Sequence, residues 1–296
     1  MRRDATLPEP SAQRATALSF DIDPLVWAAE RLIAQHRADL PKLAHVTVLI
    51  EEPLAARAFR HACLNAASAE GFPGLLGPRV LTREQWLDQV VPPTPVLNSH
   101  ARTLVLYEAI QAHATLFPQQ NLWQLCATLL TLFDELTLSQ TEPETDLSTF
   151  IEKMKTLYGA PDPIPLPLSH EATLLFTLWQ AWHEQLTAEG WQDLALSQVQ
   201  RLEASLRSVR PKEFIYLLGQ SAASNAERYW VQSLIARGVA ELIVPINTLS
   251  SGHWPETHFA ELANAFLLTS IEPSTPSPAG EFLTAAFALG KTPLLE

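Results

Sequence analysis

Two short stretches of the sequence contain residue types that could do chemistry. Gly219-Gln220-Ser221-Ala222-Ala223 follows an apolar run and comes close to the G-x-S-x-G turn that presents a nucleophilic serine, with alanine in the final place. Gly290-Lys291-Thr292 matches the end of a phosphate-binding loop, whose backbone amides wrap phosphate groups. These stretches raise two enzymatic hypotheses, a serine hydrolase that uses Ser221 and an ATPase that uses Lys291.

Both hypotheses lack supporting residues. A hydrolase of this kind needs an acid and then a histidine further along the chain, and only His253 and His258 follow Ser221. The ATPase loop has Ala285 where its first glycine should be, and Pro293 blocks the helix that must follow. Because Ser224-Asn225-Ala226-Glu227 reads as a helix-capping box, the stretch after Gly219 is best explained as a structural corner, and we predict no catalytic residue.

No group of residues has the spacing of a metal or cofactor site. Cys63 and Cys126 lie in helical patterns without a CxxC motif, which predicts two buried, reduced thiols. His253 and His258 are five residues apart, but a third and a fourth ligand are missing. We therefore expect no metal and no cofactor.

The whole-chain composition limits the class of protein. The formal net charge of −12 argues against a surface that grips nucleic acid along its whole length, although a local basic strip stays possible. No apolar run approaches the roughly 20 residues that a membrane-spanning helix needs. No apolar segment of the kind found in a signal peptide follows Met1-Arg2-Arg3, so we expect a cytoplasmic protein that does not interact with a membrane.

The elements that would position these residues alternate between strand and helix at both ends of the chain. The sequence predicts an α/β fold, a parallel sheet flanked by helices, because this alternation requires parallel pairing and right-handed crossovers. The predicted strands are 16–22, 45–50, 79–81, 214–218 and 242–246, and the predicted helices between them are 24–33, 53–67, a helix that opens with a capping box at 82–85, and 226–236.

The middle of the chain has helical periodicity and no convincing strand. Three apolar stripes at helical spacing predict an all-helical insertion into the sheet domain. The stripes are Leu104, Tyr107, Ile110, Ala114 and Phe117; Leu122, Leu125, Leu129, Leu132 and Leu136; and Leu175, Leu178, Trp179, Trp182 and Leu186. We therefore divide the chain into the first half of the α/β domain at 1–97, the helical insertion at 98–209, and the second half with a tail at 210–296.

Several segments, in order, resemble the N-terminal helicase-like region of the B subunit of AddAB-type helicase-nucleases, which belong to the RecB and PD-(D/E)XK nuclease group and repair DNA double-strand breaks. The segments are 46–50 with the arginine-bearing 55–60, Arg79-Val80-Leu81-Thr82, the helical stretches 129–136 and 175–186, Gly190-Trp191-Gln192-Asp193, and 214–221. The likeness spans about residues 20–250. It implies a degenerate P-loop helicase-like fold that guides a DNA strand beside a motor subunit.

The chain departs from active members of that family at the nucleotide site. Where an ATPase would have its phosphate loop, the sequence reads Phe20-Asp21-Ile22-Asp23-Pro24, without glycine or lysine. The resemblance therefore implies a catalytically inactive fragment of an ATP-dependent exonuclease subunit, whose nuclease domain would lie further downstream. The alternatives to this function are the serine hydrolase and a protein-interaction module without DNA contact.

The expected DNA contacts are four arginines. We predict weak binding of single-stranded DNA at the carboxyl edge of the sheet, where open α/β sheets bind ligands. The candidates are Arg57, Arg60, Arg79 and Arg83. A second cationic run, Arg201 to Lys212, is interpreted as a solvated helix end.

Overall fold

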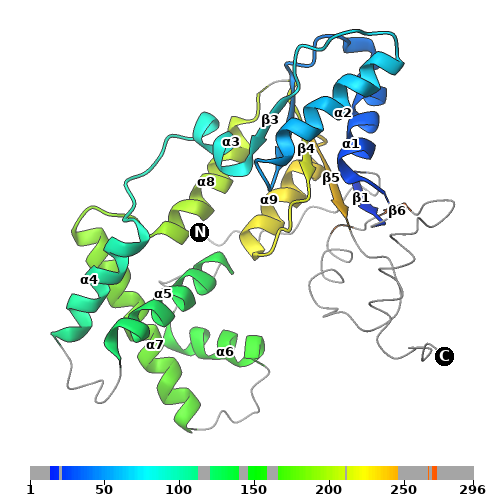
Figure 1. Ribbon diagram of the computed structural model, residues 1–296. Helices are drawn as coiled ribbons and strands as arrows, with labels where there is room; N and C mark the ends of the chain where they lie inside the picture. The colour runs from blue at the N-terminus through cyan, green and yellow to red at the C-terminus, as the bar shows by residue number, and fades with distance from the viewer. Residues whose placement is uncertain are drawn as a thin grey trace, which may run out of the picture. The chain divides into compact units, whose positions relative to one another are not determined.

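The computed structural model describes residues 14–19, 22–112, 121–139, 146–158, 166–210, 212–245, 266 and 269–271 (Figure 1). The chain divides into two compact units. The first contains Met1–Val91, Ala204–Ala223 and Glu227–Glu296, and the second contains Pro92–Glu203 and Ser224–Ala226.

The first unit is built on a six-stranded sheet with the order β3-β2-β4-β5-β1-β6, in which every neighbouring pair is parallel. The strands are β1 (Ala15–Leu18), β2 (Val46–Ile50), β3 (Arg79–Thr82), β4 (Phe214–Leu218), β5 (Ala240–Pro245) and β6 (Thr269–Ile271). The predicted α/β class is confirmed. The short strand β6 was not predicted, and β1 ends at Leu18, whereas the sequence suggested a strand that continued to Ile22.

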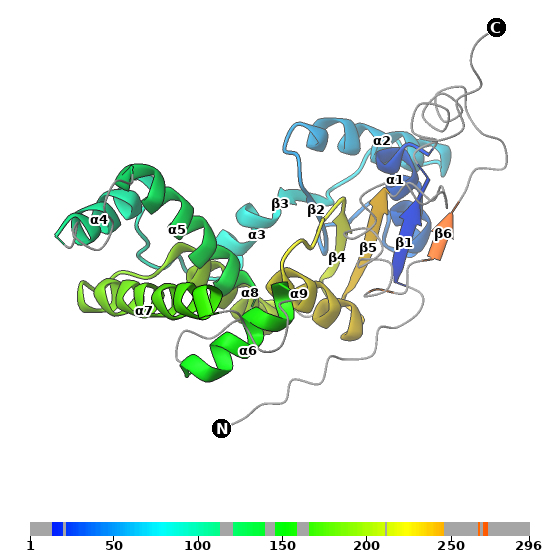
Figure 2. The ribbon, with the colours of Figure 1, turned by 90° about the horizontal axis from the view of Figure 1, so that it is seen from below.

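Helices cover both faces of this sheet, as Figure 2 shows. The helices α1 (Pro24–Gln35) and α2 (Ala55–Ala69) pack together on one face, against alternate strand residues such as Tyr216 and Leu218. Ile215 and Leu217 are fully buried on the other face, which α9 (Asn225–Ala236) covers. Burial on both faces explains why these strands read as continuous apolar runs without alternation.

The first-unit helices begin and end largely where local sequence signals place them. The side chain of Asp23 accepts hydrogen bonds from the amides of Leu25 and Val26 at the start of α1. The helix α3 (Arg83–Val90) starts with the predicted capping box, in which Thr82 and Gln85 satisfy each other's backbone amides. A short 3-10 helix, η1 (Arg37–Asp39), follows α1 and leads toward β2.

The described part of the second unit is helical apart from one isolated bridge between Val96 and Gln192. Its helices are α4 (Ser99–Gln111), α5 (Leu122–Leu138), α6 (Leu147–Tyr158), α7 (Leu166–Ala188) and α8 (Leu194–Ser208), of which the last five residues belong to the first unit. Residues 113–120, 140–145 and 159–165 lie outside the described residues. A wholly helical insertion therefore stays a prediction.

The buried faces of these helices differ in part from the predicted stripes. On α7 the prediction holds at Trp179, Trp182 and Leu186, which are buried. On α4 the prediction holds at Ile110, which is buried. It is wrong at Leu104, which is 49% exposed, because the helix turns Arg102 and Leu106 inward instead. On α5 the buried centre is shifted by one position, to Cys126, Leu130, Phe133, Leu136 and Thr137, and the predicted leucines other than Leu136 are half-buried at its margins.

A buried charge network occupies this helical core. Arg102 of α4 is 4% exposed and donates two hydrogen bonds to the carboxylate of Asp134 on α5 and one to Asp193. Asp193 also accepts from the indole N–H of Trp182 and from the amide of Ala195 at the start of α8. Asp134 is paired in this way because a buried guanidinium needs a carboxylate partner.

Candidate functional site

The strand order creates a point where chain connections diverge. The chain leaves β2 toward β3 at one side of the sheet, and it leaves the adjacent β4 toward β5 at the other side. In open parallel sheets, ligands bind outside the carboxyl ends of two strands that diverge in this way, because the connecting segments leave a crevice there. The carboxyl ends of β2 and β4 are therefore where a site is expected.

A small open hollow of about 220 Å³ lies at this point. Its lining comes from the carboxyl ends of three adjacent strands: Ile50 at the end of β2 with Glu51 after it, Arg83 and Glu84 after β3, and Gln220 and Ser221 after β4. Nearly all of these side chains are polar. The hollow is thus suited to hydrogen bonding rather than to an apolar ligand.

One hydrogen bond joins two walls of the hollow. The carboxylate of Glu51 accepts from the backbone amide of Ser221 over 2.7 Å. The turn that carries Ser221 has the positive φ angles of Gly219, 74°, and Ala222, 44°. The positive φ of Gly219, which glycine adopts without steric cost, agrees with the structural corner predicted after it.

Gln220 is the buried member of the lining. It is 4% exposed, and its Nε2 has no hydrogen-bond partner among the described atoms. A buried amide without a partner costs free energy, so such groups are uncommon. The side-chain amide of Gln220 could therefore donate a hydrogen bond to a group bound in the hollow.

The charges around the hollow are mainly negative. Glu51 and Glu84 line it, and Arg83, the one cation in its described lining, forms ion pairs with Glu84 and with Glu227 of α9. The Arg83 side chain is 21% exposed. Three carboxylates around one guanidinium disfavour a phosphate group and favour a cation or a neutral hydrogen-bonding group.

The start of α1 is where the predicted resemblance would place a phosphate site. Helix N-termini bind anions through amides that lack partners in the helix. Here the carboxylate of Asp23 accepts from the amides of Leu25 and Val26 at 2.9 and 3.2 Å, and Pro24 has no N–H to offer. A phosphate would have to displace this carboxylate and overcome its charge.

The four predicted DNA-binding arginines do not form one strip. Arg83 follows the carboxyl end of β3, as expected, but it is held by carboxylates and is not on a solvated face. The predicted place of Arg79 at the carboxyl edge is wrong, because Arg79 is the first residue of β3 and therefore lies at the amino edge. There its guanidinium pairs with Glu213 and donates to the hydroxyl of Thr47.

The other two arginines lie on α2. Arg57 is exposed and has no ion pair within the described residues. Arg60 donates a hydrogen bond to the backbone carbonyl of Val80 over 3.2 Å, so its guanidinium is drawn toward β3. Arg57 is consequently the candidate that is most accessible to a phosphate.

The serine hydrolase hypothesis gains no support at Ser221. No histidine contributes to the described lining of the hollow, and the Ser221 amide, not its hydroxyl, makes the bond to Glu51. His253, His258 and the Gly290-Lys291-Thr292 segment lie outside the described residues. A capping role for Ser224 agrees in position with the start of α9 at Asn225, while the side chain of Glu227 is paired with Arg83.

Two features of the site went unnoticed in the sequence. Glu51 could have been predicted as a site residue, because it directly follows a buried strand and parallel sheets bind ligands at the carboxyl ends of their strands. Arg83 was found, but its partner Glu227 was assigned to a helix cap, because a separation of 144 residues leaves no local signal.

The buried thiols agree with prediction. Cys63 and Cys126 are both free and buried, and burial raises the pKa of Cys63 to about 12.

Comparison with known proteins finds no family model that matches the chain and no similar curated protein. Among the described helices, none is both long enough and apolar enough to cross a membrane.

Proposed function

We propose that this chain is a catalytically inactive, helicase-like scaffold of a DNA double-strand break repair complex, which guides a single DNA strand beside a motor subunit. The observation that carries the proposal is the Asp23 cap. A carboxylate takes up the α1 amides that an ATPase would offer to phosphate, which supports a scaffold without a nucleotide cradle.

The proposed DNA contact is on α2 and is small. Arg57 is exposed, and Arg60 is near it on the same helix. The hollow does not contribute, because its carboxylates repel phosphate. One or two phosphate contacts on a single strand predict a slope of log K against log salt of about −0.7 to −1.4.

The proposed contact with the motor subunit is the hollow. A lysine, arginine or amide side chain of a partner would meet Glu51 and Glu84 and could complete the hydrogen bonding of Gln220. A hydrogen bond to a buried group that otherwise lacks a partner adds specificity as well as affinity.

Two binding measurements test the proposal. Titration with ATP and Mg²⁺ by calorimetry should give no saturable binding in the micromolar range. Fluorescence anisotropy with a labelled single-stranded oligonucleotide should detect weak binding at about 20 mM salt, with the shallow salt slope given above. Micromolar ATP binding would contradict the inactive scaffold.

A pair of charge reversals locates the DNA contact. Arg57→Glu should abolish the anisotropy signal. The matched control Lys42→Glu makes the same change in charge on an exposed residue before β2, at the amino edge of the sheet, and should leave most of the signal. Equal losses would indicate a net-charge effect, and a wild type that does not bind at low salt would favour an interaction module without DNA contact.

A further inference from the structure

Three potential metal ligands converge between α1 and β2, at the end of the sheet opposite the hollow. His36 caps the C-terminus of α1, Asp39 ends η1, and His45 directly precedes β2. Their ligand atoms all lie within 4.8 Å of one another. No metal site was predicted from the sequence, so these three residues are a new finding of the structure.

The distances in this cluster are those of ligands around a common ion. Asp39 Oδ2 lies 3.6 Å from His36 Nδ1 and 3.4 Å from His45 Nε2. Metal–ligand bonds of about 2.0–2.2 Å in a tetrahedral zinc site put neighbouring ligand atoms about 3.3–3.6 Å apart. Direct hydrogen bonds would be shorter, at about 2.7–3.2 Å.

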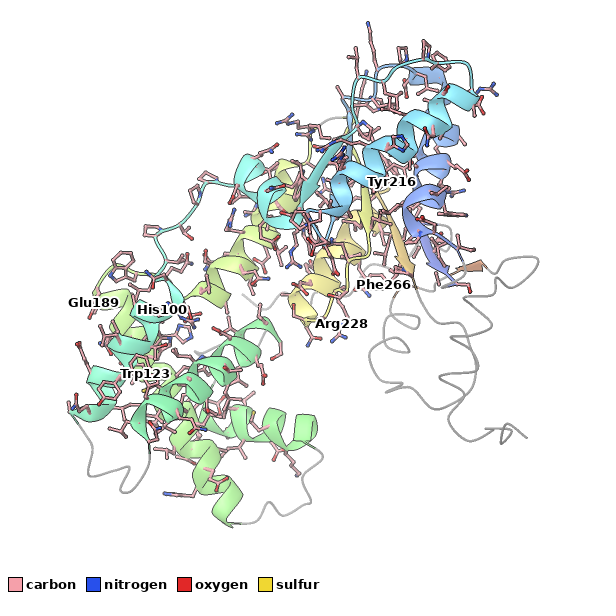
Figure 3. The ribbon with its side chains drawn as sticks, in the orientation of Figure 1. His100, Trp123, Glu189, Tyr216, Arg228 and Phe266 are labelled. Atoms are coloured by element: carbon pink, nitrogen blue, oxygen red, sulfur yellow. The ribbon has the colours of Figure 1, made fainter. Side chains whose placement is uncertain are left out.

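Packing fixes one of the ligands in place. The His36 side chain is 14% exposed, and its ring meets the rings of Phe214 and Tyr216 edge-on, at centroid distances of 5.7 and 6.0 Å. Tyr216 is labelled in Figure 3, where it lies within the sheet unit. An imidazole that is held in this way loses little conformational entropy when it binds an ion.

The other two ligands face the solvent. The side chains of Asp39 and His45 are 53% and 32% exposed. An ion can therefore enter from water, and small rotations of these two side chains can bring all three donor atoms to bonding distance. Water molecules would fill the remaining coordination positions.

From this arrangement we propose that His36, Asp39 and His45 bind a divalent transition-metal ion of the zinc class. Two imidazoles and one carboxylate suit Zn²⁺, Co²⁺ or Ni²⁺, whereas Mg²⁺ and Ca²⁺ select sites made of oxygen ligands. The bound ion joins the C-terminal end of α1 to the start of β2.

The affinity is moderate. Ligating histidines usually donate their second ring N–H to a carboxylate or a carbonyl, which orients the ring and increases its basicity. His36 Nε2 is buried and has no hydrogen-bond partner among the described atoms. With three protein ligands and this weak outer shell, we expect a dissociation constant in the micromolar range.

The test uses the full chain after treatment with a chelator and dialysis. Calorimetry with Zn²⁺ should give a saturable micromolar site, and Co²⁺ should produce the visible absorption of a low-coordinate complex that Zn²⁺ displaces. Zn²⁺ should also raise the unfolding temperature by a few degrees, because it binds only the folded arrangement.

Variants assign the site. His45→Ala and Asp39→Asn should each weaken Zn²⁺ binding at least tenfold and abolish the Co²⁺ absorption. The control His61→Ala removes a histidine from α2, where it contacts Asn65, and should change neither readout. A second control, His253→Ala with His258→Ala, excludes binding by those two histidines.

Two results would overturn the proposed metal site. A wild type that binds no Zn²⁺ at 100-fold excess over protein overturns the proposal, as does unchanged affinity in both ligand variants. Should His45→Ala fail to fold by circular dichroism, Asp39→Asn decides the matter, because its side chain is mostly exposed and keeps its size.

Discussion

The carboxylate of Glu51 accepts a hydrogen bond from the backbone amide of Ser221, which ties the end of β2 to the turn after β4. These two segments flank the point where the sheet connections diverge. The bond therefore shapes the hollow directly, and its strength can be measured without disturbing the core.

Glu51→Ala should lower the free energy of unfolding by about 1 kcal/mol, the typical net contribution of one hydrogen bond, because the bond is exposed to solvent. Glu51→Gln should retain most of the stability because its amide oxygen can still accept. Ser221→Ala should be nearly neutral, since the backbone makes the bond. Urea unfolding of the three variants checks this, and a large loss in Ser221→Ala would show that the hydroxyl has a role.

Asp23→Ala should destabilise the protein by about 1 kcal/mol, because two amides at the start of α1 lose their acceptor. Asp23→Asn should cost less, since asparagine is also a good cap. Thermal unfolding followed by circular dichroism gives both values. If Asp23→Ala is as stable as the wild type, the cap is not needed to hold α1.

Arg102→Met should lower the free energy of unfolding by about 3–5 kcal/mol, because it leaves Asp193 buried without its cation. Arg102→Lys should also be strongly destabilising, since an ammonium cannot reproduce the forked contacts to Asp134 and Asp193. Chemical denaturation measures both. Arg57→Met is the matched control on an exposed helix face and should change stability by less than about 0.5 kcal/mol.

Cys63 should not react with a thiol-specific disulfide reagent while the protein is folded. Burial raises its pKa to about 12, so almost no thiolate exists at pH 8. Burial also raises the pKa of Cys126. Both thiols should be titrated rapidly in denaturant, and a fast reaction under native conditions would show that the helices open locally.

The sequence predicted the sheet well because each of the longer strands is covered on both faces. A short, β-branched apolar run such as Val46-Thr47-Val48-Leu49-Ile50 is typical of a buried strand. The start of α3 is marked by the local hydrogen bonds between Thr82 and Gln85. The helical unit was predicted less accurately at the level of faces. Leucines dominate its helices on several sides, so periodicity alone does not show that Arg102 is turned inward while Leu104 is exposed.

The candidate sites were harder to predict because they depend on contacts between distant segments. Arg79 was assigned to the wrong edge of the sheet although it opens the predicted strand 79–81, and the first residue of a parallel strand lies at the amino edge. The pairs Arg79–Glu213 and Arg83–Glu227 bring together segments on opposite sides of the helical unit in sequence. His36, Asp39 and His45 are close in sequence, but their irregular spacing matches no standard motif.

The pairing of β2 with β4 has a consequence for synthesis on the ribosome. Val46 pairs with Phe214, and Pro92–Glu203 of the helical unit are translated between them. Until β4 emerges, β2 has a partner on one edge only, and β1 has none, because its neighbours β5 and β6 come later still. The nascent chain must therefore keep apolar strands with open edges from associating with other chains, which makes early chaperone contact with residues 15–50 advantageous.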